Sequence, residues 1–319
     1  MKRLMVIDAL NMYFRAYIVD PSLSTNGQPI GGLKGFLKIL QKLCRETKPD
    51  GVVVVWDGAG GSKKRKIVNK NYKEGRKPIR LNREIKNLSE SEEIANKIWQ
   101  QTRLFEYLNN LPIIQLVSDN VEADDVVSFI VQNSRMKGKQ KIIVSSDKDF
   151  YQLLDDETVL FRPVQKEVLN KNRIVERHGI HPTNFALARA ICGDKSDNLE
   201  GVGSAGLKTI AKRFPFLAEE KTYEIDDVIT FSKEAENRLK VYDNIIDKQD
   251  LVKENYKLMQ LYAPSLSVQS KTKINYILDN FEPEFNKTEM LKMMTEDGFG
   301  EYNWNGLFQT MKRFVVDKF

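Results

Sequence analysis

The first half of the chain contains five short apolar runs, which we expect to form β-strands. They lie at residues 2–8, 51–57, 112–117, 141–149 and 157–163. The run GVVVVWD at 51–57 is almost entirely β-branched, which favours a strand. The first, second and fourth runs each end in aspartate.

Apolar residues recur at helical spacing between these runs. The pattern predicts helices at 31–47, 89–110 and 122–134, and the SESE that opens the second of these resembles a capping box. Strands that alternate with helices indicate an α/β fold with a mostly parallel central sheet flanked by helices. From about residue 171 the pattern is mostly helical. We therefore expect an α/β core over 1–170 and a mainly helical region over 171–319.

Composition and length fit an ordinary globular protein of one large or two domains. No apolar run in the 319 residues reaches the roughly 18 that a membrane span needs, and the opening LMVI is too short for a secretory signal. Cys44 and Cys192 do not make a disulfide framework, which predicts a reducing, cytoplasmic setting. His178 and His181 lack a zinc-ligand spacing.

Most of the positive charge lies in one segment. Residues 62–86 hold eleven Lys and Arg against two Glu, whereas the rest of the chain has 39 basic and 42 acidic residues. A run of charge is usually a solvated surface loop. A strongly basic insert on an otherwise nearly neutral protein instead favours a polyanionic partner.

Carboxylates gather where the expected strands end. Open parallel sheets place their sites outside the carboxyl ends of the strands. Any single acid there could be a helix cap or a turn residue, but the set is large. It consists of Asp8, Asp57, Glu122, Asp124, Asp125, Asp147, Asp149, Asp194 and Asp197.

So many acids in one crevice need cations. Two unit charges about 4 Å apart repel by roughly 4 kcal/mol at an effective dielectric constant of about 20. Oxygen ligands without Cys or His point to Mg²⁺ or Mn²⁺ rather than zinc. Two such ions, about 3.5–4 Å apart, would stabilise in-line displacement at phosphorus.

Residues 193–206 read GDKSDNLEGVGSAG, and the last six fit G-x-G-x-x-G. A dinucleotide site needs a strand that runs into the first glycine. Here the apolar residues of 184–192 recur at helical spacing, and 207–214 is again helical. The segment at about 184–214 is therefore predicted to be two helices joined by a glycine hairpin, and not a dinucleotide site.

These segments, in this order, resemble the 5′-nuclease family. That family includes flap endonucleases, the 5′-nuclease domain of bacterial DNA polymerase I, and free-standing bacteriophage 5′-nucleases with ribonuclease H activity. The matching stretches are VIDALNMYFRAY, VVVVWDG, NYKEGRKP, VEADDVVSF, VSSDKDFYQLL and GDKSDNLEGVGSAGLKTIA. The resemblance covers about residues 4–215, and the chain looks most like the bacteriophage members.

The resemblance assigns metal ligands to all nine acids. One ion would be surrounded by Asp8, Asp57, Glu122, Asp124 and Asp147. The second would lie nearer Asp149, Asp194 and Asp197.

The resemblance also implies a basic helical arch over the active site, at about residues 60–88, through which a single-stranded 5′ end passes. Lys73 and Arg76 match a basic pair that touches the scissile phosphate, so we expect them to be catalytic together with Asp147. Tyr72 could stack on a terminal base, or it could be an exposed tyrosine that packs the arch.

Duplex DNA would be held by a helix–hairpin–helix element. By resemblance, the amides of Gly201, Gly203 and Gly206 contact phosphates, often with a bound K⁺, and Lys208 faces the DNA backbone. Arg15 matches a residue near the DNA, although a surface ion pair is the alternative. Such contacts read phosphate rather than base sequence.

The chain departs from the family pattern at a few positions. Ala9 replaces a usual glycine, Trp56 replaces a usual phenylalanine, and the hairpin glycines are closer together than in the polymerase-linked members. None of these changes removes an acid. The closing FVVDKF (314–319) fits either a docking tail or the last piece of core.

The sequence thus predicts a metal-dependent, structure-specific 5′-to-3′ nuclease acting on DNA ends, 5′ flaps and RNA–DNA hybrids. It would remove RNA primers during DNA replication by a two-metal mechanism, as a cytoplasmic monomer. Single-strand-binding protein and the sliding clamp are candidate partners. One alternative is a DNA-end binding module with an inert metal site, which would gain nothing from so many acids. Another is a PIN-like ribonuclease, which usually lacks both arch and hairpin.

Overall fold

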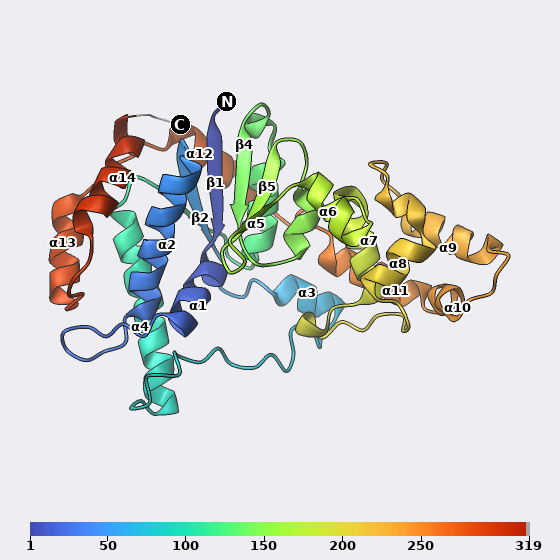
Figure 1. Cartoon of the computed structure of the whole chain (residues 1–319), viewed down its shortest axis with the longest axis horizontal. Coiled ribbons are helices and arrows are strands. Elements are labelled where there is room, and N and C mark those ends of the chain that lie inside the picture. Colours follow the sequence, from blue (N-terminus) through green and yellow to red (C-terminus); the bar gives the residue numbers. More distant parts are fainter. Residues whose placement is uncertain (317–319) are drawn as a thin grey trace.

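The computed structural model describes residues 1–316 and is built on a six-stranded sheet (Figure 1). The strand order is β3-β2-β1-β4-β5-β6, with β1 to β5 parallel and β6 antiparallel. The five predicted strands are confirmed, and β6 is the one that the pattern did not indicate. The strands are β1 (Arg3–Asp8), β2 (Gly51–Trp56), β3 (Ile114–Val117), β4 (Gln140–Val144), β5 (Thr158–Arg162) and β6 (Glu167–Leu169).

Helices surround this sheet and form the rest of the fold. The three predicted in the first half are confirmed as α2, α4 and α5, and the capping box of Ser89 and Glu92 at the start of α4 is present. The helices are α1 (Ala9–Val19), α2 (Gly31–Thr47), α3 (Lys63–Val68), α4 (Glu90–Asn109), α5 (Ala123–Val131), α6 (Lys171–His178), α7 (Pro182–Cys192), α8 (Leu207–Arg213), α9 (Ile225–Glu234), α10 (Lys240–Asp247), α11 (Gln249–Met259), α12 (Val268–Asn280), α13 (Lys287–Glu296) and α14 (Trp304–Val316).

The sheet is buried on both faces, as the continuous apolar runs require. Alternate residues of one strand enter two different cores. Leu4 and Val6 of β1 pack with α5 and α7, whereas Met5 and Ile7 pack with α1, α2 and α4. All four side chains are at most 1% exposed. The result is a doubly wound α/β core, in agreement with the predicted fold class.

The helical region predicted over 171–319 packs in two parts. Helices α8 to α12 join the core of α5 and α7, for example through Val252 and Ile274. Helices α13 and α14 return to the opposite face and pack against α2 and α4, where Met290, Leu307 and Phe314 are buried. Figure 1 shows α13 and α14 on the side of α2, away from α9 and α10. Phe314 of the closing FVVDKF therefore belongs to the core, and residues 317–319 lie outside the described part of the chain.

The basic insert is mostly irregular. Within the described residues, only Lys63–Val68 of the arch segment (60–88) is helical, so the arch is helical in part. Closely spaced lysines and arginines repel one another along a helix, and Gly75 and Pro78 both disfavour it. Figure 1 shows the arch segment running from α3 to α4 beyond the carboxyl ends of the strands.

The glycine-rich stretch joins α7 to α8, as predicted. Helix α7 ends at Cys192, so no strand leads into Gly201 and the dinucleotide reading is excluded by the fold. None of the described helices combines the length and the apolar character that crossing a bilayer demands.

The packing of α14 against α2 predicts that Leu307→Ala destabilises the whole α/β core. Leu307 is fully buried, so its truncation should lower the free energy of unfolding by about 2–5 kcal/mol. Gln309→Ala, two residues away and exposed, is the matched control and should change it by no more than about 0.5 kcal/mol. Urea denaturation followed by circular dichroism measures both. Equal stability of the two variants would contradict this packing.

Candidate active site

Four of the predicted acids meet at the carboxyl edge of the sheet. We call Asp8, Asp57, Asp124 and Asp147 the first acid group. Asp8 ends β1 and caps α1, with one carboxyl oxygen 3.1 Å from the amide of Asn11 and the other 3.0 Å from the hydroxyl of Ser145. Asp57 follows β2 and accepts a 2.6 Å hydrogen bond from the amide of Ala123, which begins the helix that carries Asp124.

The first acid group is electrostatically strained. Burial, together with the charges of Asp57 and Asp147, raises the pKa of Asp8 to about 7. Burial and the charges of Asp147 and Asp8 likewise hold the pKa of Asp124 well above its usual value. No member of the group forms an ion pair with any side chain in residues 1–316. Only the charges of Arg65 and Lys73, which do not pair with it directly, partly offset the raised pKa of Asp124. Carboxylates without a paired counter-charge favour an external cation.

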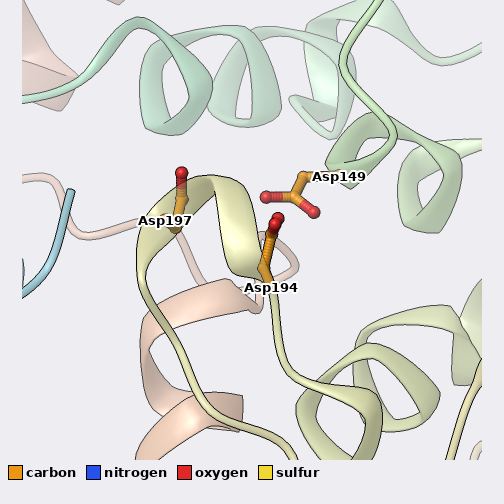
Figure 2. Close-up of side chains that lie close together, drawn as sticks. All are labelled: Asp149, Asp194 and Asp197. Atoms are coloured by element: carbon orange, nitrogen blue, oxygen red, sulfur yellow. The ribbon is translucent and has the colours of Figure 1, made fainter. Parts of the chain in front are cut away.

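Three further acids form a second acid group: Asp149, Asp194 and Asp197. One carboxyl oxygen from each lies within 4.8 Å of the others, close enough to share a metal ion. Figure 2 shows Asp194 and Asp197 on a single turn, with Asp149 facing them from another segment. Burial raises the pKa of Asp149 to about 7, with a further contribution from the charge of Asp147. All donors are carboxylate oxygens, so the group fits a hard divalent cation.

Arg189 joins the second acid group and was missed by sequence reasoning. Its Nη2 lies 2.8 Å from a carboxyl oxygen of Asp149 and also pairs with Asp194. The sequence did contain one signal for Arg189. A cation on an otherwise apolar helix end, five residues before Asp194, needs an acidic partner. The charges of Asp149 and Asp194 outweigh burial and raise the pKa of Arg189, so it stays protonated.

Glu122 and Asp125 form ion pairs, in contrast to the members of the first acid group. The resemblance had placed Glu122 around the same ion as that group. Arg65 of the arch segment pairs with both, and the Nζ of Lys73 lies 2.8 Å from Glu122. Burial alone would raise the pKa of Glu122, but Arg65 and Lys73 hold it below its usual value. Sequence reasoning also missed Arg65, because nothing in a run of basic residues distinguishes the one that turns inward.

The predicted basic pair of the arch lies against the acids. Lys73 reaches Glu122, and its backbone amide donates a 2.9 Å hydrogen bond to the carbonyl of Asp197. Arg76 pairs with the carboxylate of Asp197 and donates to the carbonyl of Ser196. The arch segment therefore brings its positive charge directly onto the metal-type site.

Tyr72 requires a correction. It is only 3% exposed and packs with Leu199, Leu258 and Met259, while its hydroxyl donates a 3.3 Å hydrogen bond to Glu122. The ring is enclosed by apolar side chains, so in this conformation it is neither available to stack on a base nor an exposed tyrosine of the arch.

The remaining predicted DNA contacts lie outside the acid groups. Arg15 is exposed on α1 and makes no ion pair with the described residues, so the surface ion pair considered for it is not formed. Lys208 is exposed in the first turn of α8, and Gly206 caps that helix. Gly203 has φ +86°, a conformation that favours glycine. A Cβ on Gly201 would stand 2.1 Å from the carbonyl oxygen of Cys192. Glycine is therefore required here because the backbone at Gly201 passes directly against the end of α7.

Comparison with known proteins identifies the family. Residues 3–179 match the family described as 5′-3′ exonuclease, N-terminal resolvase-like domain. The chain belongs to this family. It is 31% identical over 212 residues to the 5′-3′ exonuclease of Aquifex aeolicus (strain VF5), which covers 66% of this chain and 68% of that protein. It is 29% identical over 211 residues to the thermostable DNA polymerase I of Thermus aquaticus, covering 66% of this chain and 23% of the polymerase.

The fold is also found in a solved flap endonuclease. The bacteriophage T5 enzyme, in a pseudo-enzyme-product complex with DNA and metal ions, matches with a TM-score of 0.65 at 18% identity over 99% of each chain. Family membership and the acid groups together make this chain a nuclease of the 5′-3′ exonuclease family with an acidic metal-type site.

Without metal, the protein should lose stability as the pH rises from about 4 to about 7. Folding raises the pKa of Asp8 and Asp149 to about 7, so in this window the folded state keeps protons that the unfolded chain has released. Each unit of pKa difference corresponds to about 1.4 kcal/mol. Thermal melts in EDTA should give a lower Tm at about pH 8 than at about pH 5.5, and saturating Mn²⁺ should recover most of the loss.

The control for this pH dependence is Asp8→Asn, which should flatten the profile in EDTA. Burial lowers the pKa of His178 and of His181, which acts in the opposite direction, but these residues are the same in both proteins. If Asp8→Asn kept the parent's pH dependence, the loss of stability with rising pH would not come from Asp8.

The geometry of the glycine hairpin predicts different losses of stability for two glycine substitutions. Gly201→Ala forces a Cβ against the backbone of Cys192 and should destabilise the protein by about 1–3 kcal/mol. A Cβ on Gly206 meets nothing within 4 Å, so Gly206→Ala should cost only the weaker helix cap, about 1 kcal/mol or less. Denaturation midpoints compare the two. A larger loss for Gly206→Ala would refute this assignment.

Proposed function

We propose that this chain is a metal-dependent, structure-specific 5′-to-3′ nuclease that hydrolyses phosphodiesters near 5′ ends and flaps. The observation that carries the proposal is that both arch cations pair with carboxylates at the site. Lys73 pairs with Glu122, two residues before Asp124, and Arg76 pairs with Asp197 of the second acid group. A polyanion drawn to these cations would have its phosphate delivered to the acids. A dehydrogenase or a small-molecule hydrolase would need no such basic segment.

The two acid groups fit divalent cations, of which Mg²⁺ suits an all-oxygen donor set best and Mn²⁺ can replace it. The first acid group would hold one ion and the second acid group another. When bound, such ions supply Lewis-acid activation of the attacking water and neutralise charge on the phosphate. Glu122 and Asp125 would support the first site from behind, through the ion pairs that Arg65 makes with them.

The residues of the arch segment would contribute to phosphate binding. Lys73 and Arg76 compensate acids of the site. The same cations would contact the scissile phosphate, where they would favour the charge that develops in the transition state. Arg15, Lys208 and the hairpin amides would hold duplex DNA through its phosphates, with K⁺ as a hairpin ligand.

The same machinery would act on RNA–DNA hybrids, because its contacts are to phosphates rather than to bases. The proposed role is removal of RNA primers and flaps during DNA replication and repair. Single-strand-binding protein or a sliding clamp would be its partners, and the cytoplasm its location. A DNA-end binding module with an inert site remains the alternative, and cleavage separates the two.

The deciding experiment uses a 5′-labelled duplex with a short single-stranded 5′ flap, and a matching RNA–DNA hybrid. Short 5′ products should appear in Mg²⁺ and not in EDTA. Asp147→Asn should lower the single-turnover rate by about 100-fold or more, the size of effect seen when one group stabilising transition-state charge is removed, and should leave DNA binding intact.

The matched control is Asp156→Asn, at an exposed aspartate that pairs with Lys171 away from both acid groups. It should cleave like the parent. Tight binding without cleavage in Mg²⁺ or Mn²⁺ would reject the nuclease and favour the end-binding module. The hybrid substrate then ranks ribonuclease H activity against flap cutting.

A further inference from the structure

Asn255 of α11 lies beneath the turn that carries Asp194 and Asp197. Its side chain is fully buried. The Nδ2 donates one hydrogen bond of 3.0 Å to the carbonyl of Ala190 and another of 2.7 Å to the carbonyl of Glu200. These two carbonyls stand at the two ends of the metal-type turn, where the chain leaves α7 and where it enters the hairpin.

The turn is a small closed loop that rests on this base. Asp194 and Leu199 exchange two backbone hydrogen bonds of 2.8 Å each. The two ends of the loop cross closely, because a Cβ on Gly193 would lie 2.3 Å from the amide nitrogen of Gly201. A loop closed in this way moves as a unit, so fixing its base fixes where its two carboxylates point.

Helix α11 also holds the opposite half of the second acid group. Gln152, three residues after Asp149, donates to the backbone carbonyls of Asp149 and of Met259 at the end of α11. One helix therefore supports both segments whose carboxylates must lie within 4.8 Å of one another. Asn255 sets the position of one segment and Met259 that of the other.

A second buried asparagine shows what a purely structural amide looks like in this protein. Asn184 is also fully buried, but both ends of its side chain are paired: Nδ2 donates to the carbonyls of Leu217, Glu219 and Lys221, and Oδ1 accepts from the amide of Tyr223. In Asn255 the Oδ1 has no partner among the described residues. A buried acceptor left unpaired costs stability, and such costs concentrate at functional sites.

We propose that Asn255 is a positioning residue of the active site, which holds the Asp194–Asp197 turn at the distance from Asp149 that a second divalent ion requires. The inference rests on the proposed metal binding by the second acid group. It concerns geometry rather than chemistry, since Asn255 contacts only backbone carbonyls. Groups that orient metal ligands typically change metal affinity by about 10–100-fold when removed.

The test is titration of the full-length protein with Mn²⁺ alone, followed by calorimetry, without substrate or turnover. Asp194→Asn first identifies the binding step that belongs to the second acid group. Asn255→Leu should weaken that step by about 10-fold or more, and should leave the other step unchanged. Asn184→Leu is the matched control of equal burial, and should destabilise the fold without changing either step.

The outcomes are distinguishable. If the parent shows no step that Asp194→Asn weakens, the proposed metal binding at this turn fails, and the inference fails with it. If that step exists and Asn255→Leu leaves it intact, or Asn184→Leu weakens it equally, only the positioning role is overturned. Should Asn255→Leu not fold, Asn255→Ser is held to the same criteria, because it also removes the two-pronged donor while changing the packing less.

Discussion

Repulsion among carboxylates is the constraint on which the rest of this structure depends. Unit charges about 4 Å apart at an effective dielectric constant of about 20 oppose each other by roughly 4 kcal/mol, and the sheet edge collects two groups of them. The fold answers in two ways. The second acid group receives Arg76 and Arg189 as counter-charges. The first acid group receives no ion pair within residues 1–316, and the pKa values of its members Asp8 and Asp124 are raised.

That difference separates the roles of the cations around the site. Arg189 sits on α7, inside the fold, and its two ion pairs persist whatever happens to the arch segment. Lys73 and Arg76 lie on the irregular arch segment, and in the proposed function their ion pairs are exchanged for pairs with phosphate. Arg65 is intermediate, because its Nε also donates to the carbonyl of Leu258 and ties the start of the arch to α11.

The sequence alone located the acids because strand ends are readable. Asp8, Asp57 and Asp147 follow apolar runs whose carboxyl ends must share one edge of a parallel sheet. It could not show that Arg65 turns inward to Glu122, since a basic run has no periodicity that marks one member. Tyr72 was misread for a related reason: its burial depends on Leu258 and Met259, from a helix far along the chain.

The C-terminal helices, whose sequence pattern indicated the least about their structure, provide much of the structural support of the site. The return of α13 and α14 to the core of α2 depends on complementary packing, which moderate apolar periodicity does not reveal. Helix α11 is more instructive. Neighbouring residues of it face different parts of the site: Glu254 accepts a 2.9 Å hydrogen bond from Asn69 of the arch segment, and Asn255 holds the metal-type turn.

The arch and the turn therefore share one support, and they also touch each other, because the Asn198 side chain donates a 3.0 Å hydrogen bond to the carbonyl of Asn71. The arch segment and the turn that carries Asp194 and Asp197 are thus fixed to the same helix and to one another. Helix α11 holds this turn through contacts of its own, which do not involve the arch segment. The C-terminal helices are in this sense part of the active site, although none of their side chains belongs to either acid group.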